Sequence, residues 1–156
     1  MSDTTLTIDN ILVPELTLCN VPASSKKRVL ETIAEQLREH NDSVNESQIF
    51  NNLIARERLG STGIGQGIAI PHCRLEGLEQ VIGVLMTLEE AVEFDAIDNQ
   101  PVDLLFALIV PKEATSEHLE LLSQLAEKFN ERSFCDALRQ CEDAQTLFQR
   151  MTATSG

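Results

Sequence analysis

Two of the three histidines stand in surroundings that favour chemistry on an imidazole ring. His72 follows Pro71, whose ring fixes φ before it, and the segment from Gly60 to Gly67 (GSTGIGQG) precedes both. The four glycines of this segment allow backbone N–H groups to approach an anion closely. His118 is expected in the first turn of a helix, where unpaired N–H groups attract phosphate and favour a neutral imidazole. A neutral ring at either position can act as a nucleophile or as a hydrogen-bond donor.

Two arginines flank Glu57 directly before the glycine-rich segment. Arg56 and Arg58 suit the last turn of a solvated helix, where cations complement the dipole. They also suit a guanidinium that binds a phosphoryl group beside His72. Composition does not separate these interpretations. Phosphoryl transfer needs a nucleophile and a positive clamp for the oxygens, and both residue types are present here.

Other readings of the same segment are less well supported. No Gly-Lys-Ser/Thr follows the glycines, so the segment is not a Walker A loop. Gly63 and Gly65 resemble the start of a dinucleotide fingerprint, but Ile68 stands where its third glycine belongs. A thiol nucleophile at Cys73 is not expected to pair with His72, since neighbours on an extended segment face opposite ways. His40 ends a predicted helix and is interpreted as structural.

The composition excludes several classes of function. The chain has 156 residues, with 12 Lys and Arg against 25 Asp and Glu, which gives a net charge of −13. This charge repels nucleic acid, and all six aromatic residues are Phe. No apolar run is long enough to span a membrane and no signal peptide is evident, so we expect a cytoplasmic protein that is not membrane-embedded. The four cysteines show no CxxC spacing and are expected to be reduced, and no metal site is expected.

Strand and helix patterns alternate along the chain and predict an α/β fold, with helices on both sides of a sheet. The predicted helices begin at Ser24 or Ser25, at Ser43 with a capping box to Glu46, and after the N-cap Thr115. Two further helical pieces are expected at 133–140 and 143–151. Extended segments are predicted at 4–12 (strand or short irregular segment), 16–21, 68–70, 81–88 and 104–110. The apolar run at 104–110 predicts a central strand that is buried on both faces. A loop is predicted at 60–67.

Taken together, Arg56-Glu57, the stretch from Gly60 to His72 and the stretch from Phe94 to Pro111 resemble a known family. The first two are similar to the signature of the mannitol/fructose-type enzyme IIA domains of the bacterial phosphoenolpyruvate-dependent phosphotransferase system. The third, followed by His118-Leu119, resembles the nitrogen-regulatory branch of these domains. The resemblance covers nearly the whole chain. It implies one IIA-type domain over residues 1–156, with a core at about 4–151 and a mixed sheet flanked by helices.

The resemblance also implies a site. His72 matches the histidine that accepts a phosphoryl group from a phosphohistidine of HPr or its nitrogen-branch homologue. His118 matches the supporting histidine, and Arg56 the arginine that neutralises the phosphoryl group. No cofactor or metal is implied. The glycine-rich segment is then expected to contribute to the oxyanion environment through Ser61, Thr62, Gly63, Gly65 and Gly67.

The implied function is a regulatory phosphocarrier for nitrogen, potassium or stress functions, whose targets are a transporter or a sensor kinase by family analogy. The alternative is a sugar-transport IIA component that passes phosphate to a IIB domain. A binding module that kept the fold without accepting phosphate is a further possibility. We also expect Arg56, Arg58 and Arg74 to form a local positive patch on an otherwise acidic surface.

Overall fold

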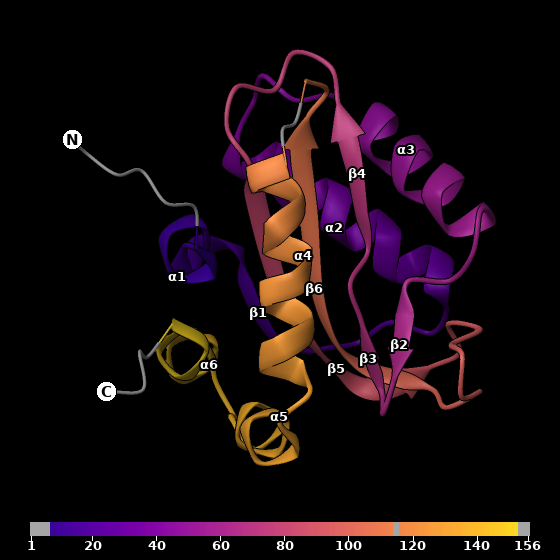
Figure 1. Cartoon of the computed structure of the whole chain (residues 1–156), viewed down its shortest axis with the longest axis vertical. Coiled ribbons are helices and arrows are strands. Elements are labelled where there is room, and N and C mark those ends of the chain that lie inside the picture. Colours follow the sequence, from indigo (N-terminus) through magenta and orange to yellow (C-terminus); the bar gives the residue numbers. More distant parts are fainter. Residues whose placement is uncertain (1–6, 114–115, 153–156) are drawn as a thin grey trace.

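A computed structural model describes residues 7–113 and 116–152 as one mixed six-stranded sheet with helices on both faces (Figure 1). The predicted α/β class is confirmed. The elements in chain order are α1 (Ile8–Ile11), a 3-10 turn (Pro14–Leu16), β1 (Thr17–Val21), α2 (Lys26–His40), α3 (Glu46–Arg58), β2 (Gly63–Gly65), β3 (Ile68–Ala69), β4 (His72–Leu75), β5 (Ile82–Val92), β6 (Val102–Pro111), α4 (Ser116–Phe129), α5 (Arg132–Arg139) and α6 (Ala144–Thr152).

Strand β6 is the centre of the sheet, as its apolar run predicted. It pairs antiparallel with β5 on one side and parallel with β3 and β4 on the other. β3 and β4 follow one another along the same edge of β6, where Ile68 is paired with Leu104 and His72 with Leu108. His72 therefore begins a new strand directly after the interruption at Pro71.

The sheet separates two hydrophobic cores. One core packs α2 and α3 against the face to which Cys73 and Leu75 point. The other core packs α1, α4, α5 and α6 against the opposite face, with Leu121, Leu125 and Phe129 of α4 fully buried. Figure 1 shows α4 lying across one side of the sheet and α2 and α3 on the other. Each helix has one apolar stripe, and the sheet offers two faces on which such stripes are buried.

The starts of α2 and α3 have side-chain caps, and one of them corrects a prediction. The Ser25 hydroxyl accepts a hydrogen bond from the Arg28 N–H, so α2 begins after Ser25, one of the two starts that the sequence predicted. The predicted cap at Ser43 for α3 is wrong: Asn45 caps this helix, and its side chain accepts a hydrogen bond from the Gln48 N–H at 3.0 Å. Ser43 instead closes the preceding turn onto Asn41. Asn and Ser are about equally good N-caps, so residue preference alone did not separate Asn45 from Ser43.

The predicted loop at 60–67 is also corrected, because its second half is a β-hairpin. β2 and β3 pair antiparallel, and Gln66 and Gly67 turn between them with φ of 60° and 80°. Positive φ at both turn positions is the geometry that matches the twist of a hairpin. A Cβ at Gly63 would lie 2.7 Å from the Ala96 Cβ, so this glycine permits close packing of two segments.

Two sequence predictions at the ends of elements have partial outcomes. The segment predicted over 4–12 contains the helix α1 in its described part, so a strand is wrong there. The predicted cap at Thr115 lies outside the described residues. Among the residues that the structure describes, none of the helices is long and apolar enough to cross a membrane.

Candidate functional site

His72 lies half-buried at the start of β4, an edge strand that pairs only with β6. Its Nδ1 lies 2.8 Å from the carbonyl oxygen of Ile70. A carbonyl oxygen only accepts hydrogen bonds, so Nδ1 carries the proton of the neutral ring. The lone pair is then on Nε2. The break between β3 and β4 supplies this carbonyl, since Ile70 lies between the two strands.

Arg56 reaches the same ring from the last turn of α3. Its Nε lies 3.2 Å from His72 Nε2 and donates to it. Its Nη1 donates to the Gly60 carbonyl oxygen at 2.8 Å. The guanidinium is thus held at one side by the turn after α3 and faces the unprotonated nitrogen of His72 at the other.

The surroundings keep the His72 ring neutral. Burial lowers its pKa below the ordinary 6.5, and the positive charge of Arg56 adds to this effect. The hydrogen bond to Ile70 and the negative charge of Glu57 act in the opposite direction without reversing the shift. At neutral pH the ring is therefore uncharged, and the lone pair on its Nε2 accepts the hydrogen bond from Arg56.

Glu57 is a buried carboxylate that sequence reasoning did not single out. Its side chain lies 2.8 Å from Lys26 Nζ, accepts the Thr62 N–H at 3.2 Å and also accepts the Thr62 hydroxyl. Lys26 donates in addition to the Phe94 carbonyl and lies over the Phe94 ring. The sequence did contain one sign that Glu57 is buried. Glu57 follows Ile49 and Leu53 at four-residue spacing, so it lies on the apolar stripe of the helix although it is charged.

The glycine-rich hairpin uses its N–H groups within the protein. The N–H of Thr62 binds Glu57, that of Gly63 binds the Ser61 hydroxyl, and that of Gln66 binds Asp98. The Ser61 hydroxyl donates to the Phe94 carbonyl at 2.6 Å. These bonds tie the hairpin to α3 through Glu57 and to the segment 94–98 through Phe94 and Asp98. A direct phosphate-binding role stays a prediction for Ser61, Thr62, Gly63, Gly65 and Gly67.

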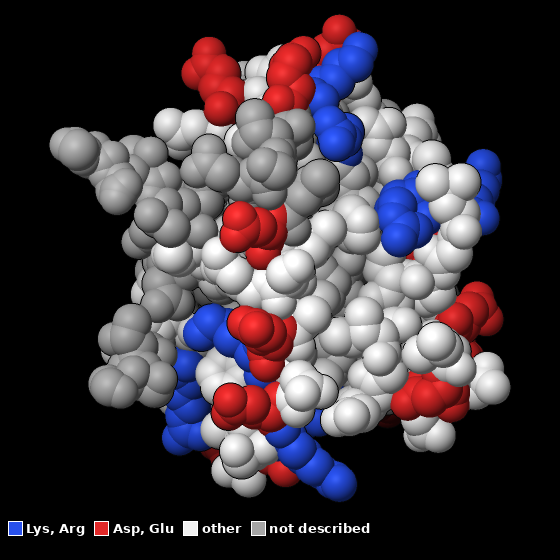
Figure 2. Space-filling model, in the orientation of Figure 1, with Lys and Arg blue, Asp and Glu red and all other residues white. Residues whose placement is uncertain are grey.

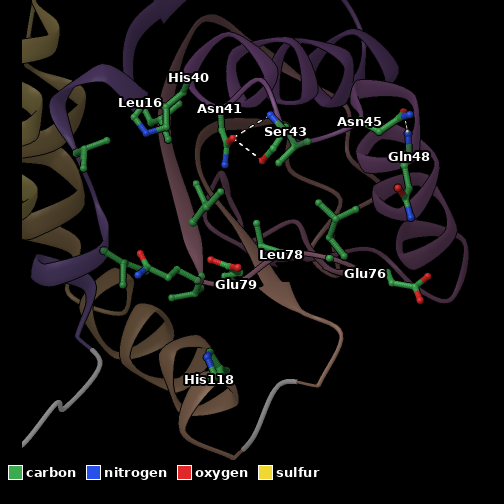
Figure 3. Close-up of a pocket in the computed structure, with 18 residues that line it drawn as sticks. Leu16, His40, Asn41, Ser43, Asn45, Gln48, Glu76, Leu78, Glu79 and His118 are labelled. Atoms are coloured by element: carbon green, nitrogen blue, oxygen red, sulfur yellow. Dashed lines mark hydrogen bonds between the residues drawn. The ribbon is translucent and has the colours of Figure 1, made fainter.

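His118 lies in a separate hollow of about 900 Å³ (Figure 3). The hollow is bounded by the end of α2, the β4–β5 connection and the first turn of α4, with His40 and Glu79 among its lining residues. Arg56 and His72 are not among the described residues that line it. His118 precedes the buried Leu121 by three positions, which places it on the sheet-facing stripe of α4. Cys73 and Leu75 face the other core, so alternation along β4 places His72 on the α4 side as well.

The face shown in Figure 2 combines cations with uncharged surface. Figure 2 shows Lys and Arg side chains at the right-hand side and at the upper end of this face, with uncharged surface between them. Arg74 donates to the Lys112 carbonyl, whereas Arg56 is bound at Gly60 and His72. A single patch that also includes Arg58 stays a prediction.

Three large apolar side chains are exposed near the hairpin, which sequence reasoning also missed. Leu59, Ile64 and Ile97 are exposed by 84%, 44% and 85%. Gly63 and Gly65 approach Ala96 and Asp98, so Ile64 and Ile97 lie on neighbouring segments. Exposed apolar side chains on neighbouring segments, such as Ile64 and Ile97, are typical of protein-binding surfaces.

Comparison with known proteins matches this architecture to one family. The family model described as "Phosphoenolpyruvate-dependent sugar phosphotransferase system, EIIA 2" matches residues 10–153. A "Nitrogen regulatory protein" of Pseudomonas aeruginosa is 50% identical over 142 residues, which cover 91% of this chain and 92% of the relative. The protein of the same description from Escherichia coli is 45% identical over 156 residues, 99% of this chain and 95% of the relative.

Solved structures agree with the sequence relatives. The nitrogen regulatory protein IIA-Ntr of Neisseria meningitidis is 42% identical, with a TM-score of 0.86 over 93% of this chain and 99% of that one. The IIA mannitol structure from Escherichia coli, at 19% identity and a TM-score of 0.69, shares the fold. The resemblance inferred from the signature residues is thereby confirmed, and this chain belongs to the EIIA 2 family of the phosphoenolpyruvate-dependent phosphotransferase system, in its nitrogen-regulatory branch.

Proposed function

We propose that this protein is a regulatory phosphocarrier that accepts a phosphoryl group on Nε2 of His72. The donor is a phosphohistidine on an HPr-like carrier protein. One observation carries the proposal: Nδ1 is hydrogen-bonded to the Ile70 carbonyl, so Nε2 holds the lone pair and faces the guanidinium of Arg56. Nucleophile and positive clamp are the two protein groups that phosphoryl transfer requires.

The transfer step is an in-line displacement at phosphorus. The Nε2 lone pair of His72 forms the new N–P bond while the N–P bond of the donor breaks. The electron pair of the broken bond returns to the donor imidazole, which leaves as the neutral ring when its other nitrogen carries a proton. His72 keeps its own proton on Nδ1, where the Ile70 carbonyl holds it and stabilises the positive charge on the phosphorylated ring.

Arg56 then donates hydrogen bonds to the oxygens of the transferred phosphoryl group. Its guanidinium already lies at Nε2, so a short displacement brings its N–H groups to the equatorial oxygens. His118 supports the transferred group from the α4 side of the sheet, as the family resemblance implies. The carbonyl of Gly60, directly before the hairpin, accepts Nη1 of Arg56 and holds the guanidinium in place.

The donor carrier docks over His72 and the surface beside it. The exposed Leu59, Ile64 and Ile97 supply apolar contact area at its margin, and the cations at this face attract an acidic rim on the carrier. Phosphorylation adds about two negative charges at this point. The same surface therefore presents two electrostatic states to its regulatory targets, which are proposed to be a transporter or a sensor kinase.

The regulatory role is favoured over the sugar relay by the pattern of relatives. The nitrogen regulatory proteins of Pseudomonas aeruginosa and Escherichia coli are 50% and 45% identical to this chain, whereas a fructose-specific EIIA component of Haloferax volcanii is 27% identical over 90% of it. The relay to a IIB domain remains the alternative that the experiment below distinguishes.

Incubation with phosphoenolpyruvate, enzyme I and the HPr-like carrier tests the proposal. The wild type should acquire an acid-labile, base-stable phosphate, and NMR of the ¹⁵N-labelled ring should place it on Nε2 of His72. His72→Ala should stay unlabelled. An unlabelled wild type contradicts the phosphocarrier, and label on His72→Ala contradicts the site. Rapid onward transfer to a purified sugar IIB domain would favour the relay over the regulator.

A further inference from the structure

Glu57 is the one buried carboxylate among the described residues, and it is 8% exposed. An ionised carboxylate is costly to bury unless it is paired and hydrogen-bonded. Glu57 has an ion pair with Lys26 and two hydrogen bonds from Thr62. The three contacts tie together the first residue of α2, the last turn of α3 and the start of the hairpin. An apolar side chain would fill this place on the stripe with Ile49 and Leu53 at lower cost.

The contacts of Glu57 close the turn between α3 and the hairpin. Thr62 is bound to Glu57 at one end of the turn, and the Gly60 N–H donates to the Glu57 carbonyl at the other. The Gly60 carbonyl lies inside this closed turn and accepts Nη1 of Arg56 at 2.8 Å. Gly60 has a φ of 150°, and a side chain added at this residue would meet no neighbouring atoms. Packing around Gly60 therefore does not hold its carbonyl in place. The position of the Gly60 carbonyl therefore depends on the two bonds that close the turn, one from Thr62 to the Glu57 carboxylate and one from the Gly60 N–H to the Glu57 backbone oxygen.

We propose that Glu57 is a positioning residue for phosphoryl transfer: by clasping Thr62 it fixes the Gly60 carbonyl, which in turn holds the Arg56 guanidinium against Nε2 of His72. This inference rests on the proposed function, since it assigns a role in the same reaction. Glu57 does not contact the His72 ring in any hydrogen bond of the described residues, so its action passes through Arg56.

A double-mutant cycle tests this route. Glu57→Gln keeps the shape of the side chain and removes the charge that binds Lys26 and Thr62. We expect it to slow phosphoryl acceptance from the phosphorylated carrier by about 10- to 100-fold, because misplacement of a catalytic group by about 1 Å costs this much. In an Arg56→Gln background the same substitution should cost less than about 2-fold, since the group that it positions is gone. Equal losses in both backgrounds would show that Glu57 acts independently of Arg56.

A matched pair of threonine variants separates positioning from general stability. Thr62→Val removes the hydroxyl that binds Glu57, and Thr87→Val removes a hydroxyl that accepts the Asn20 N–H at 2.9 Å in β1–β5. Both threonines are buried, at 5% and 4% exposure. Thr62→Val should slow transfer by about tenfold and Thr87→Val should leave it unchanged at a temperature where both are folded. If Glu57→Gln does not fold, Thr62→Val tests the same positioning role in its place. Equal effects of the two variants would contradict the positioning role.

A titration of the His72 ring by NMR gives a readout that does not require transfer. Arg56 and Glu57 are the charged groups that shift the pKa of this ring, downward and upward respectively. Loss of the Glu57 charge alone would lower the pKa of His72, whereas release of the Arg56 guanidinium raises it. A higher pKa in Glu57→Gln supports positioning, and an unchanged or lower pKa overturns it. If the wild type accepts no phosphate, the phosphocarrier role fails, and this titration alone decides whether Glu57 positions Arg56.

Discussion

Two regions of the molecule hold their histidines in different ways. One is the corner formed by His72, Arg56 and the Gly60 carbonyl, and the other is the hollow that contains His118. At the corner, each ring nitrogen of His72 has an assigned partner, and a buried ion pair lies one residue from the arginine that contacts it. The hollow around His118 is wide, and it is lined by amides, by the Glu76 and Glu79 carboxylates and by a second imidazole, His40. A nucleophile needs one nitrogen held with its lone pair in a fixed direction, and the corner meets this requirement. The hollow suits a supporting group that engages after the phosphoryl group or its donor has arrived.

The largest expected difference is between the two histidines themselves. His72→Ala should abolish phosphoryl acceptance, a loss of at least about 1000-fold, because the nucleophile is removed. His118→Ala should slow it by about 10- to 100-fold, as loss of a polar supporting group does. Stopped-flow or quench-flow labelling from the phosphorylated carrier measures both rates. Thermal unfolding of each variant is the control, and a large stability loss in His118→Ala would identify this residue as structural instead.

Next in size is the effect of the guanidinium. Arg56→Gln should slow transfer by about 10- to 100-fold and should raise the pKa of His72, since the positive charge that lowers it is gone. Arg58→Gln is the matched control, because Arg58 lies in the same helical turn and makes no hydrogen bond to the ring among the described residues. An equal loss in Arg58→Gln would mean that overall charge, and not the contact with His72, assists the reaction.

The pH dependence gives a smaller effect. The neutral ring of His72 is the nucleophile, and its pKa is lowered below 6.5. The rate of acceptance should therefore stay level as the pH falls to about 6.5 and should decline only below it. The unfolded chain binds the proton more readily, so the stabilising contribution of His72 is complete above pH 6.5 and is lost as the pH falls toward the lower folded pKa. A rate that already halves at pH 6.5, after correction for the donor, contradicts a lowered pKa.

The smallest effect is expected at the other titratable residues that line the hollow. His40→Ala and Glu79→Gln should each change transfer by less than about 2-fold, because neither residue is among the described hydrogen-bond partners of Arg56 or His72. The same labelling assay measures this. A loss in Glu79→Gln that matches the loss in His118→Ala would extend the working site into the hollow and remove the contrast between the two regions.

Much of this arrangement was predictable from local sequence. The central strand from Leu104 to Val110, the cap at Ser25 and the helix over 116–129 follow from apolar runs, capping chemistry and period. The hairpin was missed because four glycines in eight positions are typical of a loop, and their other use became visible only with Ala96 and Asp98 beside them. Glu57 was missed because its partners Lys26 and Thr62 lie on different elements.

The sequence by itself determined the α/β class, the family and the identity of His72, His118 and Arg56 as the residues to examine. These depend on residue types and on spacing along the chain, which a linear pattern records. The tertiary structure alone decided which nitrogen of His72 carries the proton, that Arg56 reaches this ring from α3, and that His118 stands in a separate hollow. Hydrogen-bond direction and the burial of a charge are set by groups that meet only when the sheet edge, the helix end and the hairpin are packed together.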